Sequence, residues 1–216
     1  MLQHYTRIFH TKKCRVVFKY SLTQFFVTAY LSRKDYNVFM VDWSNLTRFP
    51  CYLSALSNTK LAAQCTAQLY SYLTQAGALA KKITCVGHSL GAHVCGMISN
   101  HLTEKQYKII GLDPARPLVS NFGSRLFRLG RDDAYVVQVI HTNAGFLGES
   151  GLVGHVDFCV NGGRLQPGCS GHFMRMFIIR LLAMPATSFA WNLTKTLFSI
   201  RCCIDIYVGT CNIILS

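Results

Sequence analysis

Charged residues are scarce in this chain, and acidic ones most of all: among 216 residues there are 22 Lys or Arg but only 9 Asp or Glu. Because 14% of residues are charged and 50% are hydrophobic, the composition excludes an intrinsically disordered chain. The sequence also lacks the sustained repeats of a coiled coil or a collagen. It contains no base-stacking motif or recognition helix, so we expect no nucleic-acid partner despite a net charge of +13.

The ten cysteines lack the spacing of a zinc site, because no CxxC pair or Cys/His cluster is present. We therefore expect no metal. Ten cysteines are many for a cytosolic protein, and the glycosylation sequons at Asn45 and Asn192 would matter only in the secretory pathway. Both features favour an oxidising compartment.

Long apolar runs are missing as well. Residues 1–13 are polar and basic, without the apolar core and cleavage site of a signal peptide. The most apolar later stretch, residues 176–191, is interrupted by Arg180 and Pro185, so we expect no transmembrane segment. Either the protein is not secreted or this sequence lacks its true beginning.

No Pro-, Gly- or Ser-rich linker divides the chain, which predicts a single domain over residues 1–216. Apolar runs of strand length alternate with helical periodicity, which is typical of an α/β fold: a mostly parallel sheet with helices on both faces. After about residue 145 this periodicity fades. The pattern predicts strands at residues 37–42, 83–86, 107–112 and 135–141, and helices from 58 to about 77 and at 90–101.

The most informative segment is Gly87-His88-Ser89-Leu90-Gly91, which lies between a buried strand and a helix. This context is typical of a nucleophile turn, where glycines make room for a bend so sharp that the serine backbone is strained. The bend would hold the Ser89 hydroxyl at the amino end of a helix. There the Leu90 N–H could bind an oxyanion.

A serine hydroxyl needs a histidine base and an acid that orients this base. In α/β-hydrolases both follow the serine, with the acid first. Asp113 ends the next predicted strand, at the edge of the sheet where Ser89 is expected. An Asp before Pro is by itself typical of a turn, but its place beside Ser89 favours the acid. The histidines that follow are His141, His155 and His172.

Several segments resemble the pancreatic-lipase family of animal lipases, most closely the insect branch related to wasp-venom phospholipases A1. The resemblance covers about residues 29–170, and the chain looks truncated or divergent at both ends. The segments are GHSLGAH at 87–93, GLDPA at 111–115, VQVIHTNA at 137–144, GHVDF at 154–158 and NGGRLQPGC at 161–169.

This resemblance implies an α/β-hydrolase fold, incomplete at its amino-terminal end and without a carboxyl-terminal β-sandwich domain. It implies a secreted carboxylic ester hydrolase, without cofactor or metal, that acts on phospholipid or acylglycerol at a lipid interface. The chain's basic residues could favour anionic lipid surfaces, although a solvated basic face explains them equally well. The family's late cysteines imply a disulfide between Cys202 or Cys203 and Cys211.

The family's base lies in a Cys-Ser-His motif that closes a lid loop, and here Cys169-Ser170-Gly171-His172 follows at once. Two alignments are open. In one, the lid is deleted and His172 is the base, and a short lid goes with phospholipase activity in this family. In the other, Cys169 opens the lid and His172 is a lid residue. We favour His172 as the base because no later histidine exists. By resemblance, His141 and His155 occupy structural positions.

A second departure lies upstream. The family has a His-Gly-aromatic turn after an early strand, and this turn supplies a second oxyanion N–H. Residues 15–18 resemble that strand, but Lys19-Tyr20-Ser21 follows, with no glycine. Two hypotheses result: an active serine esterase that uses Ser89, Asp113 and His172, or a catalytically impaired lipase-fold protein that binds lipid or a protein partner.

Overall fold

The computed structural model describes residues 10–11, 14–16, 29–47, 51–167 and 211–215. The strands are β1 His10–Thr11, β2 Cys14–Val16, β3 Asn37–Asp42, β4 Ile83–His88, β5 Gln106–Leu112, β6 Ala134–His141, β7 Val156–Cys159 and β8 Cys211–Leu215. The α-helices are α2 Tyr52–Gln75 and α3 Leu90–Ile98. Short 3-10 turns are η1 Ser44–Leu46, η2 Ala80–Lys82, η3 Ser99–His101, η4 Arg125–Phe127, η5 Arg131–Asp133 and η6 Val160–Gly162.

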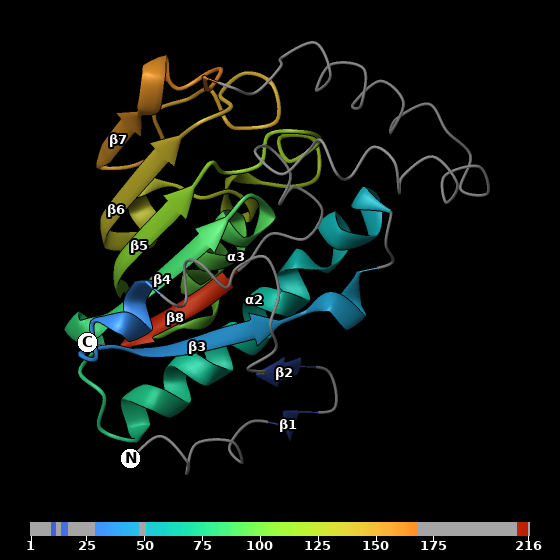
Figure 1. Ribbon diagram of the computed structural model, residues 1–216. Helices are drawn as coiled ribbons and strands as arrows, with labels where there is room; N and C mark the ends of the chain where they lie inside the picture. The colour runs from blue at the N-terminus through green and yellow to red at the C-terminus, as the bar shows by residue number, and fades with distance from the viewer. Residues whose placement is uncertain (1–9, 12–13, 17–28, 48–50, 168–210, 216) are drawn as a thin grey trace.

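All these strands form one sheet, in the order β1-β2-β3-β8-β4-β5-β6-β7 (Figure 1). Strands β4 to β7 pair in parallel. Strand β8 lies between β3 and β4 and runs antiparallel to both, so β3 points the same way as β4. The predicted mostly parallel sheet and the α/β-hydrolase type of fold are confirmed.

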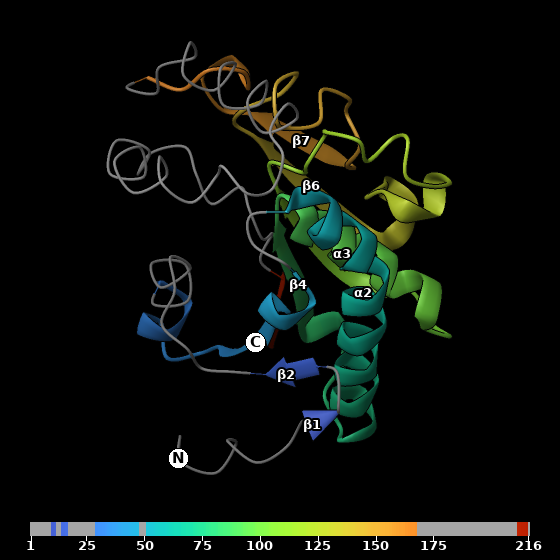
Figure 2. The same ribbon diagram turned by 90° about the vertical axis from the view of Figure 1, so that its right-hand side faces the viewer.

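Helices α2 and α3 pack against each other on one face of the sheet (Figure 2). Helix α2 connects β3 to β4 and helix α3 connects β4 to β5, so both connections cross the sheet in the same direction. Right-handed crossovers in one direction place both helices on the same face. A helical turn at residues 29–32 lies on the opposite side of the sheet (Figure 2). Four small residues on the buried side of α2 allow this close packing: Ala55, Ala62, Ala63 and Ala67.

The predicted strand at residues 37–42 has the observed bounds, and those of the other three predicted strands differ by two residues or fewer. Helix α2 begins six residues earlier than predicted, because the buried stripe extends upstream through Ala55 and Leu56. Helix α3 ends at Ile98, and its last predicted turn is the 3-10 turn η3. No helix in the described part of the chain combines the length and the apolar character that a membrane-crossing segment requires.

A disulfide joins Cys85 in β4 to Cys95 in α3, on either side of the turn that carries Ser89. Cys211 is a buried free thiol whose sulfur lies 3.5 Å from each sulfur of that disulfide. The expected pairing of Cys211 with Cys202 or Cys203 is therefore wrong. Strand β8 carries Cys211 into the core between β3 and β4, where its neighbours are Cys85 and Cys95.

Candidate active site

Ser89 is the single residue between β4 and α3. Its backbone has φ 56° and ψ −121°, in a region that non-glycine residues rarely adopt. A Cβ atom at Gly87 would lie 2.2 Å from the carbonyl oxygen of Gly91, so only glycine fits at Gly87. The turn has the strained backbone and the required glycine that the sequence pattern predicts.

Backbone hydrogen bonds attach this turn to the neighbouring strand. The Ser89 N–H donates to the Leu112 carbonyl at 3.0 Å, and the Ala115 N–H donates to the Ser89 carbonyl at 3.2 Å. His88 and Leu112 are paired across β4 and β5, so Ser89 and Asp113 each follow a paired residue at the same edge of the sheet. Within the described ranges no residue bonds the Ser89 hydroxyl, and the residue is 6% exposed.

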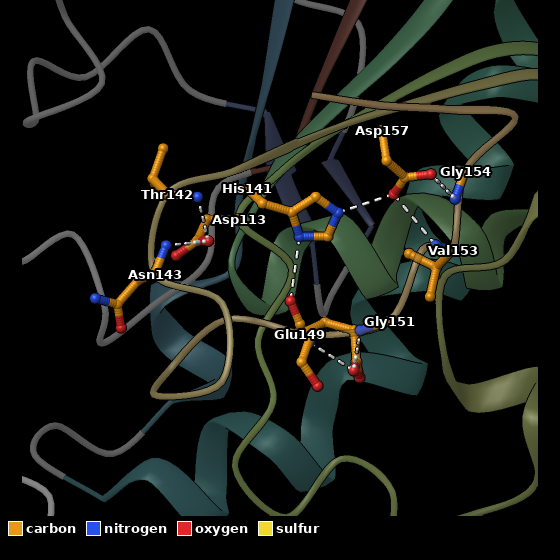
Figure 3. Close-up of polar contacts among 10 residues, drawn as sticks. Asp113, His141, Thr142, Asn143, Glu149, Gly151, Val153, Gly154 and Asp157 are labelled. Atoms are coloured by element: carbon orange, nitrogen blue, oxygen red, sulfur yellow. Dashed lines mark hydrogen bonds and ion pairs between the residues drawn. The ribbon is translucent and has the colours of Figure 1, made fainter. Parts of the chain in front are cut away.

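Asp113 is fixed through one of its carboxylate oxygens. Its Oδ1 accepts the backbone N–H groups of Thr142 and Asn143, both at 2.9 Å (Figure 3). A Cβ atom at Gly148 would approach this oxygen to 2.5 Å, so the loop after β6 closes tightly around the carboxylate. No described residue occupies Oδ2, which leaves this oxygen for a further donor.

His141 is held away from Asp113. Its Nε2 lies 2.8 Å from Asp157 Oδ1 and its Nδ1 lies 3.1 Å from the Glu149 carbonyl (Figure 3). Both ring nitrogens are therefore engaged, one with a carboxylate and the other with a backbone carbonyl. Neither nitrogen is free to take a proton from Ser89.

Two further histidines are also engaged elsewhere. His155 Nδ1 accepts the N–H of Val137, in the middle of β6. His93, in the second turn of α3, is fully buried between the Ala115 carbonyl and the Leu129 N–H, at 2.7 Å and 3.0 Å. Burial lowers the pKa of His93, which keeps this ring neutral. The sequence analysis did not single out this tie between the nucleophile helix and the segment after Asp113, although His93 lies within the GHSLGAH segment.

The expected base, His172, lies outside the described residues. The expected oxyanion donor, Leu90, is the first residue of α3, where N–H groups have no acceptor within the helix. Strand β2, which contains the start of the predicted early strand, pairs with the outer edge of β3. The place between β3 and β4 is taken by β8, which has its amino end, Cys211, opposite Gly87.

The sulfur atoms of Cys85, Cys95 and Cys211 lie within 4.8 Å of one another, close enough to hold a metal ion. Their chemistry does not fit one, because two of the sulfurs form a disulfide. Burial raises the pKa of the Cys211 thiol to about 12, which disfavours the thiolate that a metal requires.

Comparison with known proteins shows extensive similarity to lipases. A family model described as Lipase matches residues 6–184. The chain is 38% identical to lipase member H-B of Xenopus laevis over 143 residues, which are 66% of this chain and 31% of that protein. It is 39% identical to phospholipase A1 member A of Mus musculus over 148 residues, 68% of this chain and 32% of that protein. For phospholipase A1 of Vespula maculifrons the identity is 37% over 159 residues, 67% of this chain and 52% of that protein. The chain spans about a third to a half of the length of these relatives.

Proposed function

The chain belongs to the lipase family, and on this premise we propose that it is a serine-dependent carboxylic ester hydrolase that cleaves acyl esters of lipids. The observation that carries the proposal is the strained turn at Ser89, aligned through the β4–β5 register with the fixed carboxylate of Asp113. A serine in such a backbone conformation is costly to keep, and strained residues concentrate at functional sites.

In the proposed mechanism the Ser89 hydroxyl oxygen attacks the acyl carbonyl carbon as its proton passes to an imidazole. The Leu90 N–H stabilises the oxyanion that forms, aided by the amino end of α3. The intermediate collapses, the imidazolium protonates the leaving alcohol, and water then releases the fatty acid by the same steps. Asp113 Oδ2 accepts the other ring N–H and keeps the imidazole aligned.

We assign the base to His172 by elimination among the histidines that follow Asp113. His141 uses both ring nitrogens on Asp157 and Glu149, and His155 is held at the middle of β6. The chain order of serine, acid and histidine supports the same assignment.

The relatives named as phospholipases A1 make phospholipid the first substrate to test, with acylglycerol second. The interrupted Cys-Ser-His motif supports a short lid and hence phospholipid. We also propose that the protein works in an oxidising, extracellular setting, because the Cys85–Cys95 disulfide would not persist in a reducing cytosol.

The alternative is a lipase-fold protein that binds lipid or a protein partner without effective catalysis. One observation favours it: β8 occupies the place beside β4, and in the described part of the chain no second oxyanion donor joins Leu90.

A fluorophosphonate probe, which labels only an activated serine, tests the proposal on the full chain. We expect labelling of the Ser89 peptide and hydrolysis of a short-chain ester. In Ser89→Ala the labelling should be lost, and hydrolysis should fall to the weak rate that binding alone supports. Ser57→Ala is the matched control, because that exposed hydroxyl bonds only a carbonyl of its own helix. Hydrolysis that continues at the unmodified protein's rate in Ser89→Ala would eliminate the mechanism, whereas a folded protein without labelling would support the binding alternative.

A further inference from the structure

A cavity of about 270 Å³ lies on the α3 side of the sheet and is lined by basic side chains. Arg125, Arg128 and Arg131 enter it from the connection between β5 and β6, and Glu149 and Leu152 enter it from the loop after β6. Its volume is just below the roughly 300–1,000 Å³ of pockets that bury drug-sized molecules. The cavity therefore suits a small polar group rather than an acyl chain.

The charges in this cavity are unevenly paired. Arg125 is ion-paired with Asp132 at 2.6 Å, at the exposed surface. Glu149 Oε1 accepts two N–H groups of its own loop, at 2.8 and 3.0 Å. By contrast, the guanidinium groups of Arg128 and Arg131 have no hydrogen-bond or ion-pair partner among the described residues. Two guanidinium groups thus line the hollow without a side-chain partner, and the Glu149 carboxylate lines the same hollow.

The inner wall adds no positive charge. His93 is neutral, because its Nε2–H donates to Ala115 and its Nδ1 accepts from Leu129. The attraction for an anion therefore comes from Arg128 and Arg131. Guanidinium groups bind phosphate with two parallel N–H bonds each, which makes phosphate the chemistry that these side chains fit best.

The rim is apolar in a way that favours a lipid-borne phosphate over a free one. Leu126, beside Arg125, is 66% exposed, and Leu152, in the cavity wall, is 68% exposed. Exposed leucines beside unpaired arginines are typical of surfaces that enter the headgroup region of an anionic membrane.

We propose that this cavity binds the headgroup phosphate of an anionic phospholipid, with Arg128 and Arg131 as the ligands and Leu126 and Leu152 in contact with the lipid interface. The site is separate from Ser89 and does not require ester hydrolysis. It would hold the protein on an anionic surface whether or not the proposed esterase is active, so the two proposals can fail independently.

The test measures binding of the full chain to vesicles of ether-linked phospholipid, which an esterase cannot cleave. We expect tighter binding to phosphatidylglycerol mixed with phosphatidylcholine than to phosphatidylcholine alone. Arg128→Gln with Arg131→Gln should weaken binding to the anionic vesicles about thirtyfold, from about 1 kcal/mol per basic residue near the surface. Lys34→Gln with Lys81→Gln, at exposed positions outside the cavity, removes the same net charge and should weaken it no more than about threefold.

Equal losses in the two double variants would overturn the proposal, because binding would then depend on net charge alone. Inorganic phosphate distinguishes the source of the anion. We expect it to displace the protein from vesicles only at millimolar concentration. Micromolar binding of phosphate to the protein without vesicles would instead assign the cavity to a free anion. Leu126→Ser with Leu152→Ser should reduce vesicle binding and leave the effect of phosphate unchanged.

Discussion

Replacement of Asp157 by Ala should destabilise the protein strongly, because the buried carboxylate bonds the His141 ring and two loop N–H groups. The side chains of His141 and Asp157 are 2% and 6% exposed, and Asp157 also accepts the N–H groups of Val153 and Gly154 at 3.2 and 3.1 Å. Without the carboxylate, the buried His141 ring and two loop N–H groups lose a hydrogen-bond partner. Such uncompensated groups are among the few single-site causes of a large loss of stability.

Leaving a buried polar group without its partner costs about 1–3 kcal/mol, so we expect the three groups that lose Asp157 to cost about 3–5 kcal/mol together. For a chain of this length each kcal/mol lowers the melting temperature by about 2–4 °C, so Asp157→Ala should melt about 6–20 °C lower. The variant His141→Ala with Asp157→Ala should lose about 0.5–3 kcal/mol less than the sum of the single losses, because each single change already removes the interaction.

Thermal and urea unfolding followed by circular dichroism measure both quantities. Asp35→Ala is the control, since this carboxylate is paired with Arg33 at 3.6 Å but is 56% exposed. An exposed pair contributes at most about 1 kcal/mol. If Asp157→Ala were no more destabilising than Asp35→Ala, or if the double-mutant coupling were zero, the stabilising role of the His141–Asp157 contact would be refuted.

Three further predictions concern the turn, the pH dependence and the buried thiol. Gly87→Ala should lower both stability and ester turnover, because its Cβ would meet backbone at 2.2 Å, whereas Gly151→Ala, whose nearest neighbours are side-chain atoms at 3.6 Å or more, should leave both unchanged. Burial raises the pKa of Asp133 from 3.8 to about 6, so the folded protein binds this proton more tightly than the unfolded chain and loses stability as pH rises from about 4 to about 6; in urea titrations Asp133→Asn should lack this loss. Under native conditions an alkylating reagent should modify exposed Cys51 rapidly and Cys211 only after unfolding, as peptide mass spectrometry would show.

The sequence predicts well those strands whose own residues form a clear apolar run. Strand β3 has its predicted bounds because an apolar run of strand length ends in polar residues. Strand β7 was missed because it has no buried residue and follows a glycine-rich loop. Strand β8 was missed for another reason: its five residues pair with β3 and β4, more than a hundred positions away, and nothing near β8 in the sequence specifies this pairing.

The candidate site likewise combines features that the local sequence predicts with features that depend on distant segments. The turn at Ser89 and the position of Asp113 follow from local rules, a glycine where a Cβ would clash and a carboxylate at the end of the next strand. The hydrogen bond that occupies His141 Nε2 is made with Asp157, which lies on the next strand of the sheet. Periodicity does not report which ring nitrogen is free, so the sequence left several histidines open as bases.

The oxyanion site shows how a non-local strand can affect chemistry. A strand parallel to β4 in the neighbouring position would end at the Ser89 edge, and the turn that follows it could supply an N–H. Strand β8 is antiparallel and begins at that edge with Cys211, so no turn follows it there. Loss of one oxyanion donor costs about 10²–10³ in turnover but leaves the activation of the serine by its base unaffected. If Leu90 acts alone, Ser89 should therefore react readily with a fluorophosphonate and still turn over esters slowly. Fast turnover would require a second donor at this edge of the sheet.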